Sequence, residues 1–359
     1  MSNFPEKGLN VAISRIPQTD YNTATTPASN SFVREVLKQR TQPTIQPSSQ
    51  NNASYATGYG FPTESWIEKW GTAWQWAFDL ASQNIGRYLL AAMGSVVTSQ
   101  PNAGTDPTVY QHVFSPLPFL TSSQLPAYSL VAQLLPGSNG LNRLLPSMTA
   151  KSLQINSSGL AKLDGAVSWM GSGKETTPSG VTWASHVNEV AGALNFFFAK
   201  QNEIILSDPD GSTNLVNVKC DIKKSSFTVE NSFAEDDYGC PLFVNSDPSL
   251  GAIRSQYLLT DQKYGMQFTL KTRNDNPEHA AILAQTPFKI IQKWVGPTIS
   301  NSYTHLLEIT ASLAKYSAVE DGFDQGFAIV NVTPDLLYST TAAKIVSVKL
   351  INTVASYTT

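Results

Sequence analysis

Apolar residues recur at every second position in many short segments of this chain, and this spacing constrains the fold more than any other feature. The clearest case is WQWAFDL, residues 74–80, in which large apolar residues alternate with small or polar ones. Side chains two positions apart lie on the same face of a β-strand, so the pattern predicts a half-buried strand. Its apolar face consists of Trp74, Trp76, Phe78 and Leu80.

The same alternation continues along the rest of the chain, with Gly, Pro, Asn and Ser clusters that favour turns between the segments. Helical stretches of 10–15 residues almost never separate these segments. We therefore expect a mainly β protein, an antiparallel β-sandwich or barrel. The further alternating segments are TVYQHVF (108–114), AYSLVAQLL (127–135), AKLDGAVSW (161–169), LVNVKCDI (215–222), GMQFTLK (265–271), HLLEITA (305–311) and KIVSVKLIN (344–352).

One segment, QNIGRYLLAAMG at residues 83–94, departs from this pattern and predicts a single short α-helix flanking the sheet. Ser82 is suited to the N-cap, and Gly94 is suited to ending the helix in a left-handed conformation. About twelve residues are too few to span a bilayer, so the helix is expected to pack against the sheet and close one side of it. The residues of its packing face are Ile85, Leu89 and Met93.

The chain divides into an N-terminal arm and one large β domain. Residues 1–57 are rich in Thr, Pro, Gln and Asn and poor in bulky apolar residues, so they cannot bury enough surface to fold alone. Two readings of this arm stay open, a disordered leader or an arm that is ordered against a neighbouring subunit. Residues 58–359 form the β domain, with room for an insertion or decoration within residues 175–300.

The charge content limits the partners that the chain can bind. Charged residues make up 14% of the chain, against about 25% in an average soluble domain, and the net charge is −3. Such a surface gives no basic footprint for nucleic acid and suits a subunit of an assembly. Cys220 and Cys240 match neither a disulfide framework nor a zinc pattern, so we expect two free thiols in a reducing cytoplasm. No signal peptide and no membrane-spanning run is visible.

The motifs that could carry chemistry are incomplete. GSGKETT (171–177) lacks the spacing and the Ser or Thr of a phosphate-binding loop, and SDPDGSTN (207–214) holds only fragments of a calcium loop. Both are better explained as turns, and AEDDYG (234–239) and EDGFDQG (320–326) as solvated acidic loops. No catalytic residue, metal ligand or cofactor site is therefore expected. The four histidines, which share no ligand spacing, are His112, His186, His279 and His305.

The seven tryptophans allow an alternative function. Exposed aromatic rings stack on sugars, so the Trp-rich segment 66–76 could belong to a carbohydrate-binding or receptor-binding β module. Burial in the β core is the simpler expectation. If Trp74, Trp76 and Phe78 face inward against the helix, the stacking platform is excluded. A third hypothesis, an esterase-like enzyme, requires a Ser within hydrogen-bond reach of one of the histidines.

The order of several segments resembles the tail tube proteins (major tail proteins) of long-tailed bacteriophages. The resemblance covers about residues 60–200 well and the C-terminal half more loosely. After the N-terminal arm come WQWAFDLASQNIGRYLLAAMG, the YQHVF strand, and the series LPAYSLVAQLL, NRLLPSMTAKSLQINSSG and LAKLDGAVSWMGSG. The closing KIVSVKLINTVASY resembles the terminal strand of that family.

This resemblance implies a structural, non-enzymatic virion protein that is assembled in the host cytoplasm and located in the virion tail. Subunits of that family join edge to edge into rings, usually hexameric, and the rings stack into a tube that conducts DNA during ejection. The implied partners are further copies of the chain and other tail proteins, namely the terminator, the baseplate and the tape measure. Genomic DNA would pass non-specifically through a weakly charged lumen. Nothing in the resemblance identifies the lumen-lining residues.

Overall fold

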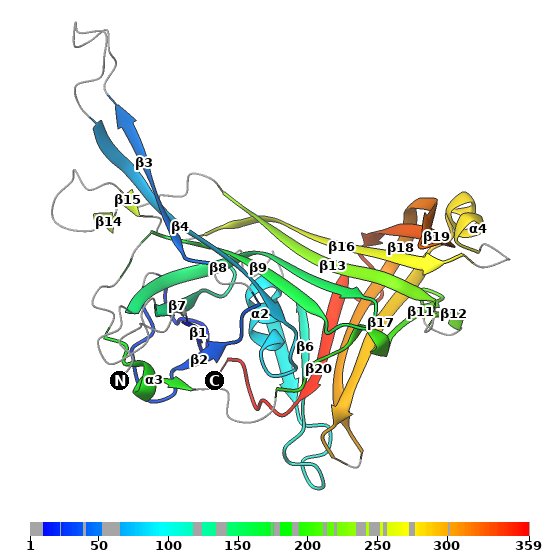
Figure 1. Cartoon of the computed structure of the whole chain (residues 1–359), viewed down its shortest axis with the longest axis horizontal. Helices are drawn as coiled ribbons and strands as arrows, with labels where there is room; N and C mark the ends of the chain where they lie inside the picture. Colours follow the sequence, from blue (N-terminus) through cyan, green and yellow to red (C-terminus); the bar gives the residue numbers. More distant parts are fainter. Residues whose placement is uncertain are drawn as a thin grey trace, which may run out of the picture.

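We describe the protein from a computed structural model of the whole chain (Figure 1). The residues that the structure describes are 10–21, 23–38, 41–51, 65–117, 124–133, 142–173, 175, 180–188, 194–210, 214–218, 221–234, 242–243, 252–253, 257–272, 277–300 and 302–358.

Strands dominate the described residues, and most adjacent pairs are antiparallel. The first ten strands are β1 (Asn10–Ser14), β2 (Phe32–Glu35), β3 (Thr44–Asn51), β4 (Ser65–Asp79), β5 (Gly94–Ser99), β6 (Tyr110–Pro116), β7 (Tyr128–Gln133), β8 (Asn142–Ser158), β9 (Asp164–Gly171) and β10 (Val187–Asn188). The other ten are β11 (Asn202–Ser207), β12 (Asn214–Val218), β13 (Ile222–Phe233), β14 (Leu242–Phe243), β15 (Ala252–Ile253), β16 (Leu259–Lys271), β17 (Phe288–Thr298), β18 (Thr304–Asp324), β19 (Phe327–Leu337) and β20 (Val346–Asn352).

Helices are few and short. The helical elements are α2 (Ile85–Met93), α3 (Trp183–His186), α4 (Pro277–Ala284) and the 3-10 turn η1 (Ala199–Gln201). Among the described residues, no helix combines the length and apolar character needed to cross a membrane. The mainly β class predicted from the alternating segments is therefore confirmed.

The long strand β18 joins two layers of the main sheet. Along one edge, β18 pairs first with β20 and then with β19, while β17 pairs along its other edge. One layer runs β5-β6-β20-β18-β17-β11-β12, and the other runs β18-β19-β16-β13-β8-β9-β4-β3. Figure 1 shows the two layers running in different directions with α2 between them. The arrangement is an open sandwich, and the described strands do not close into a barrel.

A smaller sheet adjoins the main one, in the order β10-β2-β1-β7-β8. Strand β8 belongs to both sheets, because its first residues pair with β7 and its later residues pair with β9 and β13. Ser147 has a φ of 60° at the transition, a left-handed conformation that is uncommon for residues with a side chain. The strand therefore bends where it passes from one sheet to the other.

Two segments of the predicted arm, residues 1–57, lie inside this smaller sheet. Strand β1 pairs with both β2 and β7, and Ala12 and Ile13 are completely buried. Only short apolar runs, such as NVAIS, were needed for this, and the surrounding polar residues concealed them from a composition analysis. The arm interpretation is thus corrected for these strands, which are ordered against their own chain.

The region 175–300 also contributes to the sandwich. Strands β11, β13, β16 and β17 are members of the main sheet, and Phe227, Met266 and Ile290 belong to the same core as α2. These described strands are part of the sandwich itself and not a decoration on its surface. Their alternating burial, as in Met266, Phe268 and Leu270, follows the pattern predicted from the sequence.

Candidate functional site

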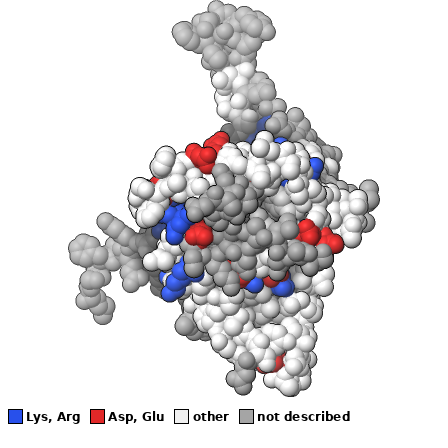
Figure 2. Space-filling view, turned by 90° about the vertical axis from the view of Figure 1, so that its right-hand side faces the viewer, with Lys and Arg blue, Asp and Glu red and all other residues white. Residues whose placement is uncertain are grey.

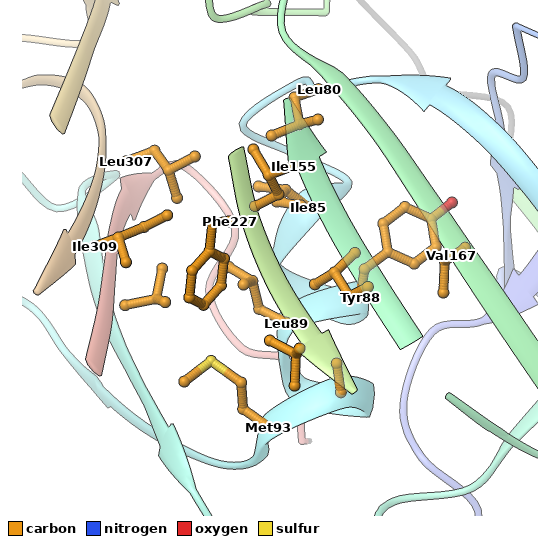
Figure 3. Close-up of a cluster of buried hydrophobic side chains, with 14 of the residues drawn as sticks. Leu80, Ile85, Tyr88, Leu89, Met93, Ile155, Val167, Phe227, Leu307 and Ile309 are labelled. Carbon is orange, nitrogen blue, oxygen red and sulfur yellow. The ribbon is translucent and has the colours of Figure 1, made fainter. Parts of the chain in front are cut away.

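Helix α2 occupies the centre of the protein. All nine of its residues are buried, including the three predicted for its packing face, Ile85, Leu89 and Met93. Figure 3 shows these side chains among residues of both layers, with Ile155 and Phe227 on one side and Leu307 and Ile309 on the other. Burying an aliphatic side chain of this size contributes about 1.5–3 kcal/mol, so α2 is a main source of core stability.

The position of α2 differs from the expected flanking helix. A helix that covers one face of a sheet keeps a polar face in water, whereas a helix buried on every side lies within a core. Here the strands of both layers surround the helix, and even Arg87 is buried. The apolar stripe of the sequence indicated one packed face, but the second layer, built from residues far along the chain, covers the other.

The ends of α2 follow the sequence only in part. Gly94 ends the helix in a left-handed conformation with φ of 100°, and its N–H donates to the Leu90 carbonyl, as predicted. The predicted N-cap, Ser82, is wrong, because the helix begins two residues later with Asn84 at the N-cap. The Asn84 Oδ1 atom accepts a hydrogen bond from the Ala81 N–H at 3.2 Å, which fixes the chain entering the helix.

The C-terminal segment is fastened to α2 by a buried polar cluster. Asn352 Nδ2 donates to the Ser82 carbonyl at 2.6 Å and to the Tyr357 hydroxyl at 2.8 Å. Tyr357 lies directly over Gly86 and is completely buried. Since a buried amide without partners would cost about 1–3 kcal/mol, these bonds hold the end of the chain in one position.

His112 completes this cluster as a structural residue. Its Nε2 lies 2.9 Å from the Val354 carbonyl and its Nδ1 lies 2.9 Å from the Thr98 hydroxyl, so a neutral ring donates at Nε2 and accepts at Nδ1. Burial lowers the pKa of His112, which favours this neutral form. The ring is thus engaged on both nitrogens by structural partners.

The other histidines stand apart from one another. His305 is buried in β18, His186 accepts from the Thr182 N–H at 3.0 Å, and His279 lies 3.2 Å from an Asp321 carboxylate oxygen. Within the described ranges, no group of three or more His, Cys, Asp or Glu side chains is placed to hold a metal ion. Cys220 and Cys240 lie outside the described residues.

The turn motifs have the following positions. Strand β9 ends at Gly171, and Lys174 of the GSGKETT segment lies outside the described residues. The residues after Asp210 in SDPDGSTN and after Ala234 in AEDDYG also lie outside them, apart from Asn214. The expected acidic loop at 320–326 is wrong. These residues extend β18 to Asp324 and form a tight hairpin with φ of 52° at Gln325 and 83° at Gly326.

The tryptophans of the predicted platform face the core. Trp74, Trp76 and Trp169 are buried and contact one another and Tyr88 of α2 through edge-on and tilted ring contacts. Trp294 is buried in the other layer. Since Trp74, Trp76 and Phe78 point inward against the helix, the sugar-stacking platform built on them is excluded.

Two opposite ends of the molecule are shaped for contacts with other molecules. At one end, β3 and the first part of β4 form a two-stranded ribbon that projects beyond the body (Figure 1). At the other end, α4 packs beside the β18–β19 hairpin and the surface exposes large apolar side chains. We call this surface the distal apolar end, and it consists of Leu283, Phe323 and Phe327, which are 86%, 84% and 58% exposed.

The distal apolar end lies on a surface of low charge. Figure 2 looks onto this side of the molecule and shows acidic and basic side chains scattered among mostly uncharged residues. Exposed aromatic and aliphatic side chains that gather on such a surface mark a contact site for another protein more often than a solvent face. Sequence analysis missed this site because Phe323 was assigned to an acidic loop.

Open sheet edges are the second feature that favours association. Among the described strands, β3 pairs only with β4, β5 only with β6, and β12 only with β11. Each therefore leaves one row of backbone N–H and C=O groups without a strand partner in the described part of the chain. Such edges can accept a strand from a neighbouring molecule.

Comparisons with known proteins leave the family open. No protein-family model matches this chain, and no curated protein matches it significantly. The fold class and the arrangement of its surfaces are therefore the basis for the functional proposal.

Proposed function

We propose that this protein is a structural subunit that assembles into stacked rings and forms the tail tube of a long-tailed bacteriophage. The observation that carries the proposal is its two-ended shape, with the β3–β4 ribbon at one end and the distal apolar end at the other. A contact between two different surfaces of identical subunits propagates around a ring when the rotation between subunits closes. The ordered resemblance of the sequence to tail tube proteins supports the same assignment.

The fold is compatible with such an assembly. Core packing against α2 makes the subunit rigid, and the open edges of β3, β5 and β12 offer strand pairing between copies. The proposed subunit has no catalytic step and no cofactor. Its partners are further copies and the terminator, baseplate and tape-measure proteins of the virion tail. DNA passes through the lumen without specific contacts, for which a low surface charge is suited.

Electron microscopy of the purified protein tests this proposal. Negative-stain images across a concentration series should show rings or hollow tubes of uniform bore. The double variant Leu283→Ser with Phe323→Ser should raise the concentration needed for assembly, because it removes the apolar contact. The matched control is Tyr338→Ser, which alters a 60% exposed side chain beyond the other end of β19. A monodisperse monomer at high concentration that binds glycans on an array would refute the tube and support the receptor-binding alternative.

A further inference from the structure

A polar cleft opens beside α2 and is separate from the surfaces proposed for assembly. It has a volume of about 400 Å³ and lies between β2, the N-terminal end of α2 and the residues that follow β20. This volume is in the range of small-molecule sites. Its lining residues are Arg15, Val33, Arg34, Glu35, Val36, Gln83, Asn84, Arg87, Asn188, Leu194, Thr353, Val354 and Ala355.

Two charged side chains at this cleft are buried by the fold. Glu35 lies on the inner face of β2, opposite Val11 of β1, and is 4% exposed, while Arg87 of α2 is 6% exposed. The Arg87 Nη1 and Glu35 Oε1 atoms are 3.6 Å apart, too far for a hydrogen bond. Among the described residues, both Glu35 oxygens and the Arg87 Nε have no hydrogen-bond partner.

Unpaired polar atoms at such depth are costly, at about 1–3 kcal/mol each and more for charged groups. Proteins retain such atoms mostly where a ligand or water completes their bonds. The Glu35–Arg87 pair therefore marks the cleft as a binding site and not as a simple surface depression.

The charge of the cleft selects the ligand. Three arginines and one glutamate are the charged residues among those that line it, so it carries a net positive charge. The first turn of α2 contains no acidic residue that would neutralise the positive end of the helix. Arginine side chains bind planar oxyanions through two parallel hydrogen bonds, so the cleft is suited to a carboxylate or a phosphate.

The remaining walls distinguish between these anions. Val33, Val36, Leu194, Val354 and Ala355 supply apolar surface that a hydrocarbon body would cover and that inorganic phosphate would not. We propose that this cleft binds an organic carboxylate through Arg15, Arg34 and Arg87, with Glu35 positioned to donate a hydrogen bond in its protonated form. The carboxylate belongs either to a small organic acid or to an acidic side chain of a second copy of this chain. The proposal does not depend on the tail tube assignment.

Protonation of Glu35 makes binding dependent on pH. The titratable groups around Glu35 are Arg87 and Tyr88 of α2 and Tyr357 of the C-terminal segment, with Arg34 as its neighbour in β2. Burial raises the pKa of Glu35 to about 7, although Arg87 opposes the rise. An anionic ligand is repelled by ionised Glu35 and accepted by the neutral acid. Affinity should therefore fall as pH rises through 7, by about tenfold between pH 6 and pH 8.

Calorimetric titration with benzoate tests the cleft directly. Benzamide, which has the same shape without the charge, and inorganic phosphate, which lacks the hydrocarbon body, are the comparison ligands. Benzoate should bind more tightly than either. The Arg15→Gln, Arg34→Gln double variant should weaken benzoate binding by at least about tenfold, the loss expected for charge-assisted hydrogen bonds. The matched control is Lys263→Gln, which removes an exposed cation outside the cleft. Glu35→Gln should keep binding and lose its pH dependence.

Sedimentation velocity separates the two sources of the carboxylate. If an acidic side chain of a second copy fills the cleft, the double arginine variant should associate more weakly than the Lys263→Gln control, and benzoate should compete with association. If a small acid is the ligand, benzoate binds and association is unchanged. The proposal is overturned if benzamide or phosphate binds as tightly as benzoate, or if the double variant binds like the wild type. It is equally overturned if benzoate fails to bind while the arginine variant associates normally.

Discussion

Replacing Gly86 with Ala is the sharpest test of how α2 and the C-terminal segment pack together. A Cβ atom on Gly86 would overlap the ring and hydroxyl of Tyr357, far inside the 3.0 Å that real Cβ atoms keep from other heavy atoms. Tyr357 is completely buried, and its hydroxyl accepts a hydrogen bond from Asn352 at 2.8 Å. The tyrosine therefore cannot move aside without breaking the cluster that fastens the C-terminal segment.

The expected loss of stability combines three contributions. Overpacking a closed core costs about 1–3 kcal/mol, and a displaced Tyr357 hydroxyl loses a buried hydrogen bond worth about 1 kcal/mol. Alanine in place of glycine within a helix gives back about 1 kcal/mol. Because the ring is enclosed, we expect the upper part of the range, a decrease of about 3 kcal/mol in the free energy of unfolding.

Urea unfolding followed by circular dichroism measures this decrease, and a double-mutant cycle assigns it to the ring. Tyr357→Ala alone should cost about 3–5 kcal/mol, as for other large buried aromatic residues. In that background the clash is gone, so Gly86→Ala should become stabilising by up to about 1 kcal/mol. The control is Gly104→Ala, where the nearest atom to an added Cβ is 3.9 Å away, and this change should have little effect.

The sign reversal is the decisive result. If Gly86→Ala is equally destabilising with and without the Tyr357 ring, then the ring does not pack over Gly86 and the proposed fastening of the C-terminal segment is wrong. If Gly86→Ala is harmless in the wild-type background, the helix and this segment do not pack as the structure describes.

Two further changes test the interior. Burial raises the pKa of Glu35 from 4.5 to about 7, so the folded protein binds this proton more tightly than the unfolded chain. Its contribution to stability is full below pH 4.5 and is lost as pH rises through 7; relative to Glu35→Gln, the wild-type free energy of unfolding should fall by about 2 kcal/mol between pH 5 and pH 7.5, and a constant difference would contradict this burial. Ile85→Asp, measured by soluble yield, should abolish folded protein, because a carboxylate in this core lacks any partner and costs more than about 4 kcal/mol. Val97→Asp, at a 71% exposed position, should remain soluble, and a soluble, folded Ile85→Asp protein would refute the central packing of α2.

The strands and their buried faces could be predicted from the sequence because the period of two is a local property. The residues predicted to share a face in WQWAFDL are all buried, and so are Val346, Val348 and Leu350 near the C-terminus. The stop of α2 at Gly94 was equally predictable, since a left-handed C-cap depends on one residue type. These features need only a few neighbouring residues to be specified.

The candidate sites could not be predicted in the same way. Glu35 and Arg87 are single charged residues within short apolar runs, FVREV and IGRYLL, and that is the only local sign of their burial. They are 52 positions apart in the chain and meet only because β2 and α2 are packed together. Likewise, Asn231 of β13 donates to the Ala92 carbonyl at 3.0 Å, a contact that no local pattern predicts.

The sequence by itself determined the local geometry of this protein: the alternation makes strands, the turn residues separate them, and one apolar stripe ending in glycine makes a helix. Only the tertiary structure decided that the helix lies between two layers and that strands from the polar N-terminal region enter the smaller sheet. It also decided which ends and charges face outward. The physical reason is that alternation states which face of a strand is buried but not against what, because the partner comes from residues far along the chain.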